Sequence, residues 1–142
     1  MTVPDPITLV RTYLLTVSAV TSLASTRIYG ERIPASDAAS MPRACVVLSA
    51  AGGPATEWLR TIDSRIDVRC YGTTPLAARA LAWSAYDALA WLSKRTIGSG
   101  ATAGKLYKAE PELAPLSQID PDTNWPSAVF SLLVTTSREP TA

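Results

Sequence analysis

The residues that could do chemistry in this sequence are few and scattered. The 142 residues contain no histidine, so the side chain used most often for acid–base catalysis and for metal binding is missing. The two cysteines, Cys45 and Cys70, lie far apart in the sequence and cannot by themselves close a zinc site. Each lies in an apolar, strand-like run, so we expect two reduced thiols in the core and no disulfide.

The remaining candidate motifs lack the spacing that their chemistry requires. Ser49, in the sequence LSAAG, does not form the G-x-S-x-G turn of a serine hydrolase. The glycines at 52–53 and within 98–104 lack the spacing of a phosphate-binding loop, and no lysine–serine pair follows them. Paired acids occur in turn-like sequence, which favours solvated carboxylates over a catalytic or calcium-binding pair: Glu110 with Glu112, and Asp120 with Asp122. We therefore expect no enzymatic activity, no catalytic residue, no cofactor and no bound metal.

In place of catalytic groups, the sequence offers side chains suited to contacts. It contains four tryptophans, of which Trp83 and Trp91 project to the side of an apolar helix stripe. They either wrap the edge of the core or anchor a subunit interface, where tryptophan is enriched. Arg79, one turn before Trp83, is placed to stack on its ring.

The charged residues that follow are segregated by sign. A basic group precedes an acidic group along the chain: Lys94, Arg95, Lys105 and Lys108, then Glu110, Glu112, Asp120 and Asp122. These groups form either an ordinary solvated surface or complementary patches on neighbouring subunits. The candidate interface residues are Arg79, Trp83, Trp91, Lys94, Arg95, Lys105, Lys108, Glu110 and Glu112.

A strand followed at once by a helix must position most of these residues. Residues 62–71 alternate apolar and polar side chains, the period of a half-buried strand. Thr74 and Pro75 then supply a helix start, and the helix is predicted to run to about Arg95. Lys94 and Arg95 would sit at the negative end of its dipole. Its predicted apolar stripe consists of Ala77, Leu81, Ala85, Ala88, Leu89 and Leu92. We expect this strand–helix pair to form the folding core.

The flanking segments predict further elements around this pair. The N-terminal part predicts a helix from Asp5-Pro6 to about residue 17, a short helical turn at 18–25, a short strand at 27–30, a loop at 31–42 and an interior strand at 44–50.

The central strand is expected to extend over 57–71, with a bulge or bend near Ser64. After the helix, residues 96–104 are small and predict a mobile linker that trypsin would cut at Arg95 or Lys105. Residues 105–119 predict an edge strand that breaks off at its prolines, and residues 127–136 predict a final alternating strand.

Composition and element order together predict one α+β domain spanning residues 1–142. The chain is 47% hydrophobic and 18% charged, as is typical of ordered globular proteins. Strands in runs, with helices set apart, favour a mostly antiparallel sheet of about four strands with helices packed on one face. The net charge of +1 gives no reason to expect a membrane or a specific nucleic-acid partner. No run of about 18 apolar residues is present, so we expect no membrane span.

The order of elements resembles that of the tail terminator (tail completion) proteins of long-tailed phages. The resemblance rests on the N-terminal helix, the RIYG strand, the segment MPRACVVLSA, the RIDVRCYG strand with its alanine-rich helix, and the closing DPDTNWPSAVFSLLV turn and strand. It covers nearly the whole chain, through the pattern and order of elements and not through an invariant motif.

The resemblance implies a virion protein that works by contacts. It implies a homo-oligomeric ring, typically hexameric, that caps the tail tube, ends its polymerisation and presents a surface to the head–tail connector protein. The implied partners are further copies of this chain, the tail tube protein and the connector, with room for DNA to pass through the ring. The implied location is the head-proximal end of the tail in the virion, and the host cytoplasm during assembly. Two alternatives stay open: a head–tail joining (neck) protein, which would also form a ring, and a small ligand-binding or enzymatic domain.

Overall fold

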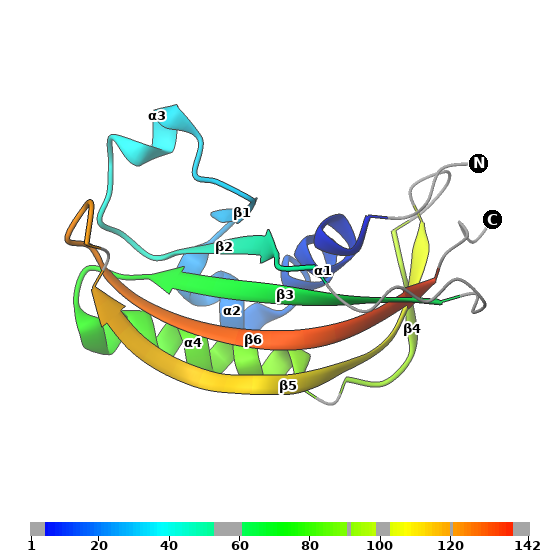
Figure 1. Cartoon of the computed structure of the whole chain (residues 1–142). Coiled ribbons are helices and arrows are strands. Elements are labelled where there is room, and N and C mark those ends of the chain that lie inside the picture. Colours follow the sequence, from blue (N-terminus) through cyan, green and yellow to red (C-terminus); the bar gives the residue numbers. More distant parts are fainter. Residues whose placement is uncertain (1–4, 53–60, 91, 99–102, 120, 138–142) are drawn as a thin grey trace.

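A six-stranded sheet runs through the molecule, and helices α1, α2 and α4 lie along one of its faces (Figure 1). The computed structural model describes residues 5–52, 61–90, 92–98, 103–119 and 121–137. The spatial order of the strands is β1-β2-β3-β6-β5-β4, in which β1 and β2 are parallel and all other neighbours are antiparallel. The elements are α1 (Pro6–Leu14), α2 (Ser18–Ala24), β1 (Ile28–Gly30), α3 (Ala35–Ala38), β2 (Cys45–Ala50), β3 (Thr61–Tyr71), α4 (Pro75–Leu89), β4 (Arg95–Ile97), β5 (Gly104–Ile119) and β6 (Pro126–Ser137).

The predicted α+β class is confirmed, whereas the predicted number of strands is wrong. The sheet has six strands where we expected about four. Two of the six are three-residue edge strands, β1 and β4. The short strand β1 was predicted, but β4 lies where the sequence predicted the end of a helix and the start of a linker.

Helix α4 begins where predicted and ends six residues early. At its start the Thr74 hydroxyl accepts a hydrogen bond of 3.1 Å from the amide of Ala77. At its end the Tyr13 hydroxyl of α1 donates to the carbonyl of Ala88 at 3.0 Å, which satisfies a carbonyl that the helix itself leaves free. The backbone turns extended at Ala90, so Lys94 and Arg95 lie beyond the helix and not at its terminus. The C-terminal end of α4 is therefore accompanied by a contact with the distant helix α1. No glycine or proline in the sequence marked this helix end.

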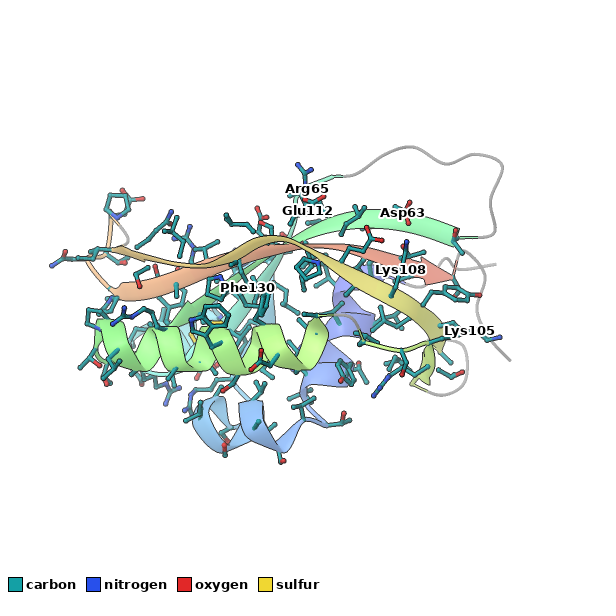
Figure 2. All side chains as sticks on the ribbon, turned by 90° about the horizontal axis from the view of Figure 1, so that it is seen from below. Asp63, Arg65, Lys105, Lys108, Glu112 and Phe130 are labelled. Carbon is teal, nitrogen blue, oxygen red and sulfur yellow. The ribbon has the colours of Figure 1, made fainter. Side chains whose placement is uncertain are left out.

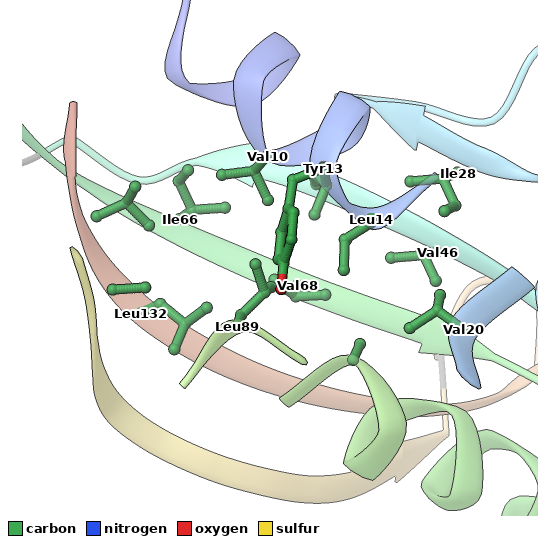
Figure 3. Close-up of a cluster of buried hydrophobic side chains, with 14 of the residues drawn as sticks. Val10, Tyr13, Leu14, Val20, Ile28, Val46, Ile66, Val68, Leu89 and Leu132 are labelled. Carbon is green, nitrogen blue, oxygen red and sulfur yellow. The ribbon is translucent and has the colours of Figure 1, made fainter. Parts of the chain in front are cut away.

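The main core fills the space between these helices and the inner face of the sheet. Figure 3 shows side chains of α1, α2 and α4 meeting those of β2, β3 and β6. On α4 the predicted Leu81, Ala85 and Leu89 are buried, and Ala78 and Ala82 are buried beside them. The predicted Ala77 and Ala88 are only partly buried, so the stripe is turned slightly around the helix axis.

The two cysteines lie on opposite faces of the sheet. Cys70 alternates with Ile66 and Val68 toward the helices, whereas Cys45 packs with Tyr71 on the other side. Both are buried free thiols, as predicted.

The inner strands differ from the prediction in their regularity. The register between β3 and β6 runs without a shift from Thr61 to Tyr71, so the bulge expected near Ser64 is absent there. The part of the expected strand before Thr61 lies outside the described residues.

Strand β5 continues through both prolines instead of breaking off. Its register with β6 shifts between Pro111 and Leu113 and again between Leu113 and Leu116, the interval that contains Pro115. Bulges of this kind accommodate proline because the ladder is already interrupted there. Among the described strands, β4 pairs with the first three residues of β5 and no other strand joins it on that side, so the rest of β5 forms an edge of the sheet, as predicted.

The prediction of a mobile linker over residues 96–104 is wrong at both ends of that segment. Residues Arg95–Ile97 are strand β4, and the side chains of Ile97 and Ala103 are buried. Lys105 also lies in a strand, paired with Thr96. Residues 99–102 of the expected linker lie outside the described residues.

Helix α1 covers the opposite edge of the sheet. The Arg11 guanidinium donates from Nε to the carbonyl of Ile28 in β1 at 2.6 Å. A Cβ atom at Gly30 would approach the Ile7 side chain to 3.1 Å, which shows how closely α1 lies against this strand. No single described helix is long and apolar enough to cross a membrane; α1 and α2 pass such a test only as a pair, which is bent by 87°.

Candidate interaction surface

The candidate site is the outer face of the sheet, which points away from α1, α2 and α4. Figure 2 shows Asp63 and Arg65 of β3 and Lys108 and Glu112 of β5 on this side, with Phe130 on the other side toward α4. The outer face therefore carries the polar half of the alternation seen in the sequence of β3.

Hydroxyl groups of β6 hold the carboxylates of β3 in place on the outer face. The Ser131 hydroxyl donates to Asp67 Oδ1 at 2.7 Å, and the Thr135 hydroxyl donates to Asp63 Oδ1 at 2.6 Å. Both pairs are cross-strand neighbours in the β3–β6 ladder. These carboxylates are hydrogen-bonded within the sheet and are not poised as an acid–base pair.

Two ion pairs bring acidic and basic groups together on the outer face, one between β3 and β5 and one within β5. Arg65 contacts Glu112 with both Nε (2.6 Å) and Nη2 (3.4 Å), and Lys108 Nζ lies 2.8 Å from Glu110 Oε1. The hydrogen bonds to these carboxylates raise the pKa of the Arg65 guanidinium and of the Lys108 ammonium. The groups that are segregated by sign in the sequence are thus partly neutralised in the fold. Sequence reasoning missed Arg65, because its partner is 47 residues away.

Lys94 and Arg95 lie over aromatic rings. Lys94 Nζ is 5.2 Å from the centroid of Tyr107, and the Arg95 guanidinium carbon is 4.7 Å from the centroid of Tyr13. Both distances suit a cation–π contact.

An apolar strip crosses the outer face where β5 meets β6. Leu113 and Leu116 are 44% and 51% exposed, and they pair with Ser131 and Val129 of β6. Since paired residues of an antiparallel ladder lie side by side on one face, both leucines belong to the outer face with the half-buried Val129. We call Leu113, Leu116 and Val129 the leucine strip.

The structure does not bring the predicted interface residues into one patch. Arg79 and Trp83 lie on α4, in the helix layer, while Lys108 and Glu112 lie on the opposite side of the sheet (Figure 2). Lys105 and Glu110 also belong to β5, and Trp91 lies outside the described residues.

Trp83 lies at the edge of the core with 46% of its surface exposed. Its ring packs edge-to-face on Tyr86 at 5.4 Å, and Tyr86 packs in the same way on the buried Phe130 at 5.6 Å. Arg79 makes no cation–π contact with Trp83 in the described structure, contrary to our expectation. Packing on Tyr86 therefore holds the Trp83 ring in place, while the exposed part of the ring stays accessible to a partner.

A second apolar cluster covers the outer face at the β2 end. Ile33 and Met41, from the segment that contains α3, pack on Cys45 and Val47. Asp37 of this segment accepts a hydrogen bond of 2.5 Å from the Tyr29 hydroxyl and pairs with Arg43 at 3.0 Å. Trp125 joins this cluster by packing edge-to-face on Tyr71 of β3. Beyond the cluster, no described helix or strand covers the outer face over β3, β6 and β5 (Figure 1).

The hollows at the surface are open, and the one described next is lined by few charged side chains. One hollow of about 290 Å³ lies between α1 and β4, with Tyr13 and Arg95 in its lining. Within the described ranges, no three histidine, cysteine or acidic side chains come together as metal ligands.

Comparisons with known proteins give a match in fold but none in sequence. No family model and no curated protein matches this sequence. A solved structure titled as the virion of a native gene transfer agent (GTA) particle contains a chain that superposes with a TM-score of 0.66 at 14% sequence identity. The match covers 93% of this chain and 94% of that chain. The two chains share a fold along almost their whole length, and at this identity the likeness shows the fold alone.

Proposed function

We propose that this chain is a structural protein of a phage-like virion and that it forms a ring of the tail terminator type. The observation that carries the proposal is the fold shared, over nearly the full length of both chains, with a chain of a gene transfer agent virion. The finer part of the proposal, a ring of the tail terminator type, rests on the order of elements in the sequence, which resembles that of tail terminators.

In this proposal the ring is a hexamer that caps the tail tube, ends its polymerisation and faces the head–tail connector. A closed ring with head-to-tail contacts needs two different surfaces on each subunit. The described chain offers two such surfaces, because its helices lie on one face of the sheet and its polar outer face lies on the other. The virion location and the lack of catalysis follow from this role.

Light scattering and negative-stain microscopy of the full chain test the proposal. We expect a ring with about six times the 15.1 kDa mass of one subunit. Added to growing tail tubes, it should bind one end and stop elongation, whereas tubes alone should keep growing.

The other outcomes of this experiment separate the alternatives. A ring that binds filled heads and leaves tube growth unchanged would assign the chain to the neck. A chain that stays monomeric at all concentrations and binds neither tubes nor heads would overturn the virion proposal.

A further inference from the structure

We propose that the leucine strip of one subunit receives Trp83 of the next subunit, so that β5 and β6 of one copy pack on α4 of another. The inference rests on the proposed ring and specifies which two surfaces meet in it.

The strand side of this contact is built by a bulge. Leu113 and Leu116 are three residues apart, so in a regular strand they would point to opposite faces. The register shift between them adds a residue and turns both side chains to the outer face, next to Val129. Single exposed leucines are common on protein surfaces, but two beside a half-buried valine make a continuous apolar strip.

Polar groups border the strip. Asp67 and Arg69 of β3 lie beyond Ser131 and Val129 in the same rows of the sheet. The Arg65–Glu112 ion pair lies at one end of the strip, beside Leu113. An apolar centre with a charged border is the usual anatomy of a protein–protein contact.

The helix side presents one large aromatic group between two charges. Arg79 and Asp87 lie four residues before and after Trp83, so the three side chains share one face of α4. Arg79 and Asp87 are exposed and, in the described part of the chain, make no ion pair. A half-exposed tryptophan supported by Tyr86 is the type of residue that dominates binding energy at interfaces.

The two surfaces suit a second copy of this chain. They lie on opposite sides of the sheet, so they cannot meet within one subunit, yet head-to-tail packing brings such sides together. The border of the leucine strip carries both signs of charge, and so does the exposed face of α4 around Trp83, which allows complementary pairing. Addition of a strand to β5 is a poorer fit, because Pro111 and Pro115 lack amide donors.

Disulfide capture tests the contact directly. The native Cys45 and Cys70 are buried, so a chain with Trp83→Cys or Leu116→Cys carries one accessible thiol. After mild oxidation of an equimolar mixture, we expect covalent dimers that are absent from either chain alone and from the unmodified chain. Ile119→Cys is the matched control: this side chain is 61% exposed on the same strand, but it pairs with Pro126 and faces the other side of the sheet. It should not link to Trp83→Cys.

A second pair of variants keeps the test decisive if oxidation disturbs the ring. Leu116→Asp should abolish the ring while keeping the wild-type melting temperature within a few degrees, and Ile119→Asp should leave the ring intact. Rings that persist in Leu116→Asp, or rings that show no mixed dimer, would overturn this contact and leave the proposed function standing. Self-linking of Leu116→Cys alone would overturn it in favour of a two-fold contact. A wild-type chain that never oligomerises would overturn both proposals.

Discussion

At the scale of single residues, burial raises the pKa of three groups that packing keeps neutral, and it raises that of the Cys70 thiol in the main core the most. Burial raises the pKa of the Cys45 thiol to about 12, and burial with the hydrogen bond to Asp37 raises that of the Tyr29 hydroxyl to about 12. A reactive cysteine needs the opposite shift, because the thiolate is the nucleophile. Cys45 and Tyr29 therefore serve a structural role in the cluster at the β2 end.

We predict that stability falls in alkaline solution, and that these groups cause part of the fall. In the unfolded chain Cys45 ionises near 9.0 and Tyr29 near 10.0, whereas in the folded chain both keep their protons to about 12. Between these values the unfolded state binds fewer protons, so the free energy of unfolding decreases as pH rises, and it is unaffected by these groups below pH 9.

Urea denaturation at a series of pH values measures this effect. Cys45→Ala should show a shallower decrease between pH 9 and 12 than the wild-type chain. Ser49→Ala, on the same strand, introduces no change in titrating groups and should keep the wild-type slope. An unchanged slope in Cys45→Ala would contradict the assignment.

At the scale of elements, helix α4 is held along its buried stripe and at its end. We predict that Leu81→Asp abolishes soluble folding, because Leu81 is 1% exposed and an unpaired carboxylate there costs several kcal/mol. Whole domains are stable by only about 5–15 kcal/mol. The soluble fraction and melting temperature after expression measure the effect, with the exposed neighbour Ala80→Asp as control. A soluble Leu81→Asp chain with a wild-type melting temperature would show that the stripe is wrongly assigned.

For a substitution at the end of α4 we predict a smaller loss of stability. Tyr13→Phe removes the hydroxyl that donates to Ala88, and we expect a loss of about 0.5–1.5 kcal/mol in the free energy of unfolding. Tyr107→Phe is the control, since the Lys94 contact uses its ring and not its hydroxyl. Equal effects of both variants in urea denaturation would contradict the role of Tyr13 at the helix end.

These elements also show what the sequence could and could not predict. Thr74 and Pro75 mark the start of α4 by local chemistry, and the alternation of β3 assigns its faces, so both were predictable. The end of α4 was not, because it depends on Tyr13, which lies 75 residues from Ala88. The leucine strip was not predictable either, since a bulge decides the face on which Leu116 lies.

At the scale of the whole molecule, the subunit has two unlike sides. In the proposed ring an apolar centre carries the contact, and apolar burial is not screened by salt, whereas exposed charge pairs are screened within about 3 Å at 1 M ionic strength. We predict that the ring keeps its mass, measured by light scattering, at 0.15 M and at 1 M sodium chloride. Dissociation at high salt would instead favour the complementary charged patches considered from the sequence.

The way in which the two sheet edges are blocked affects the tendency of this protein to aggregate. Unpaired strand edges template the aggregation of β-proteins, and amyloid-like stacking is its extreme form. Here Arg11 occupies the carbonyl of Ile28 at one edge, and Pro111 and Pro115 interrupt the ladder along the other. Free subunits should therefore tolerate high concentration without fibril growth, and a chain that associates through side chains can stop at a fixed number of copies.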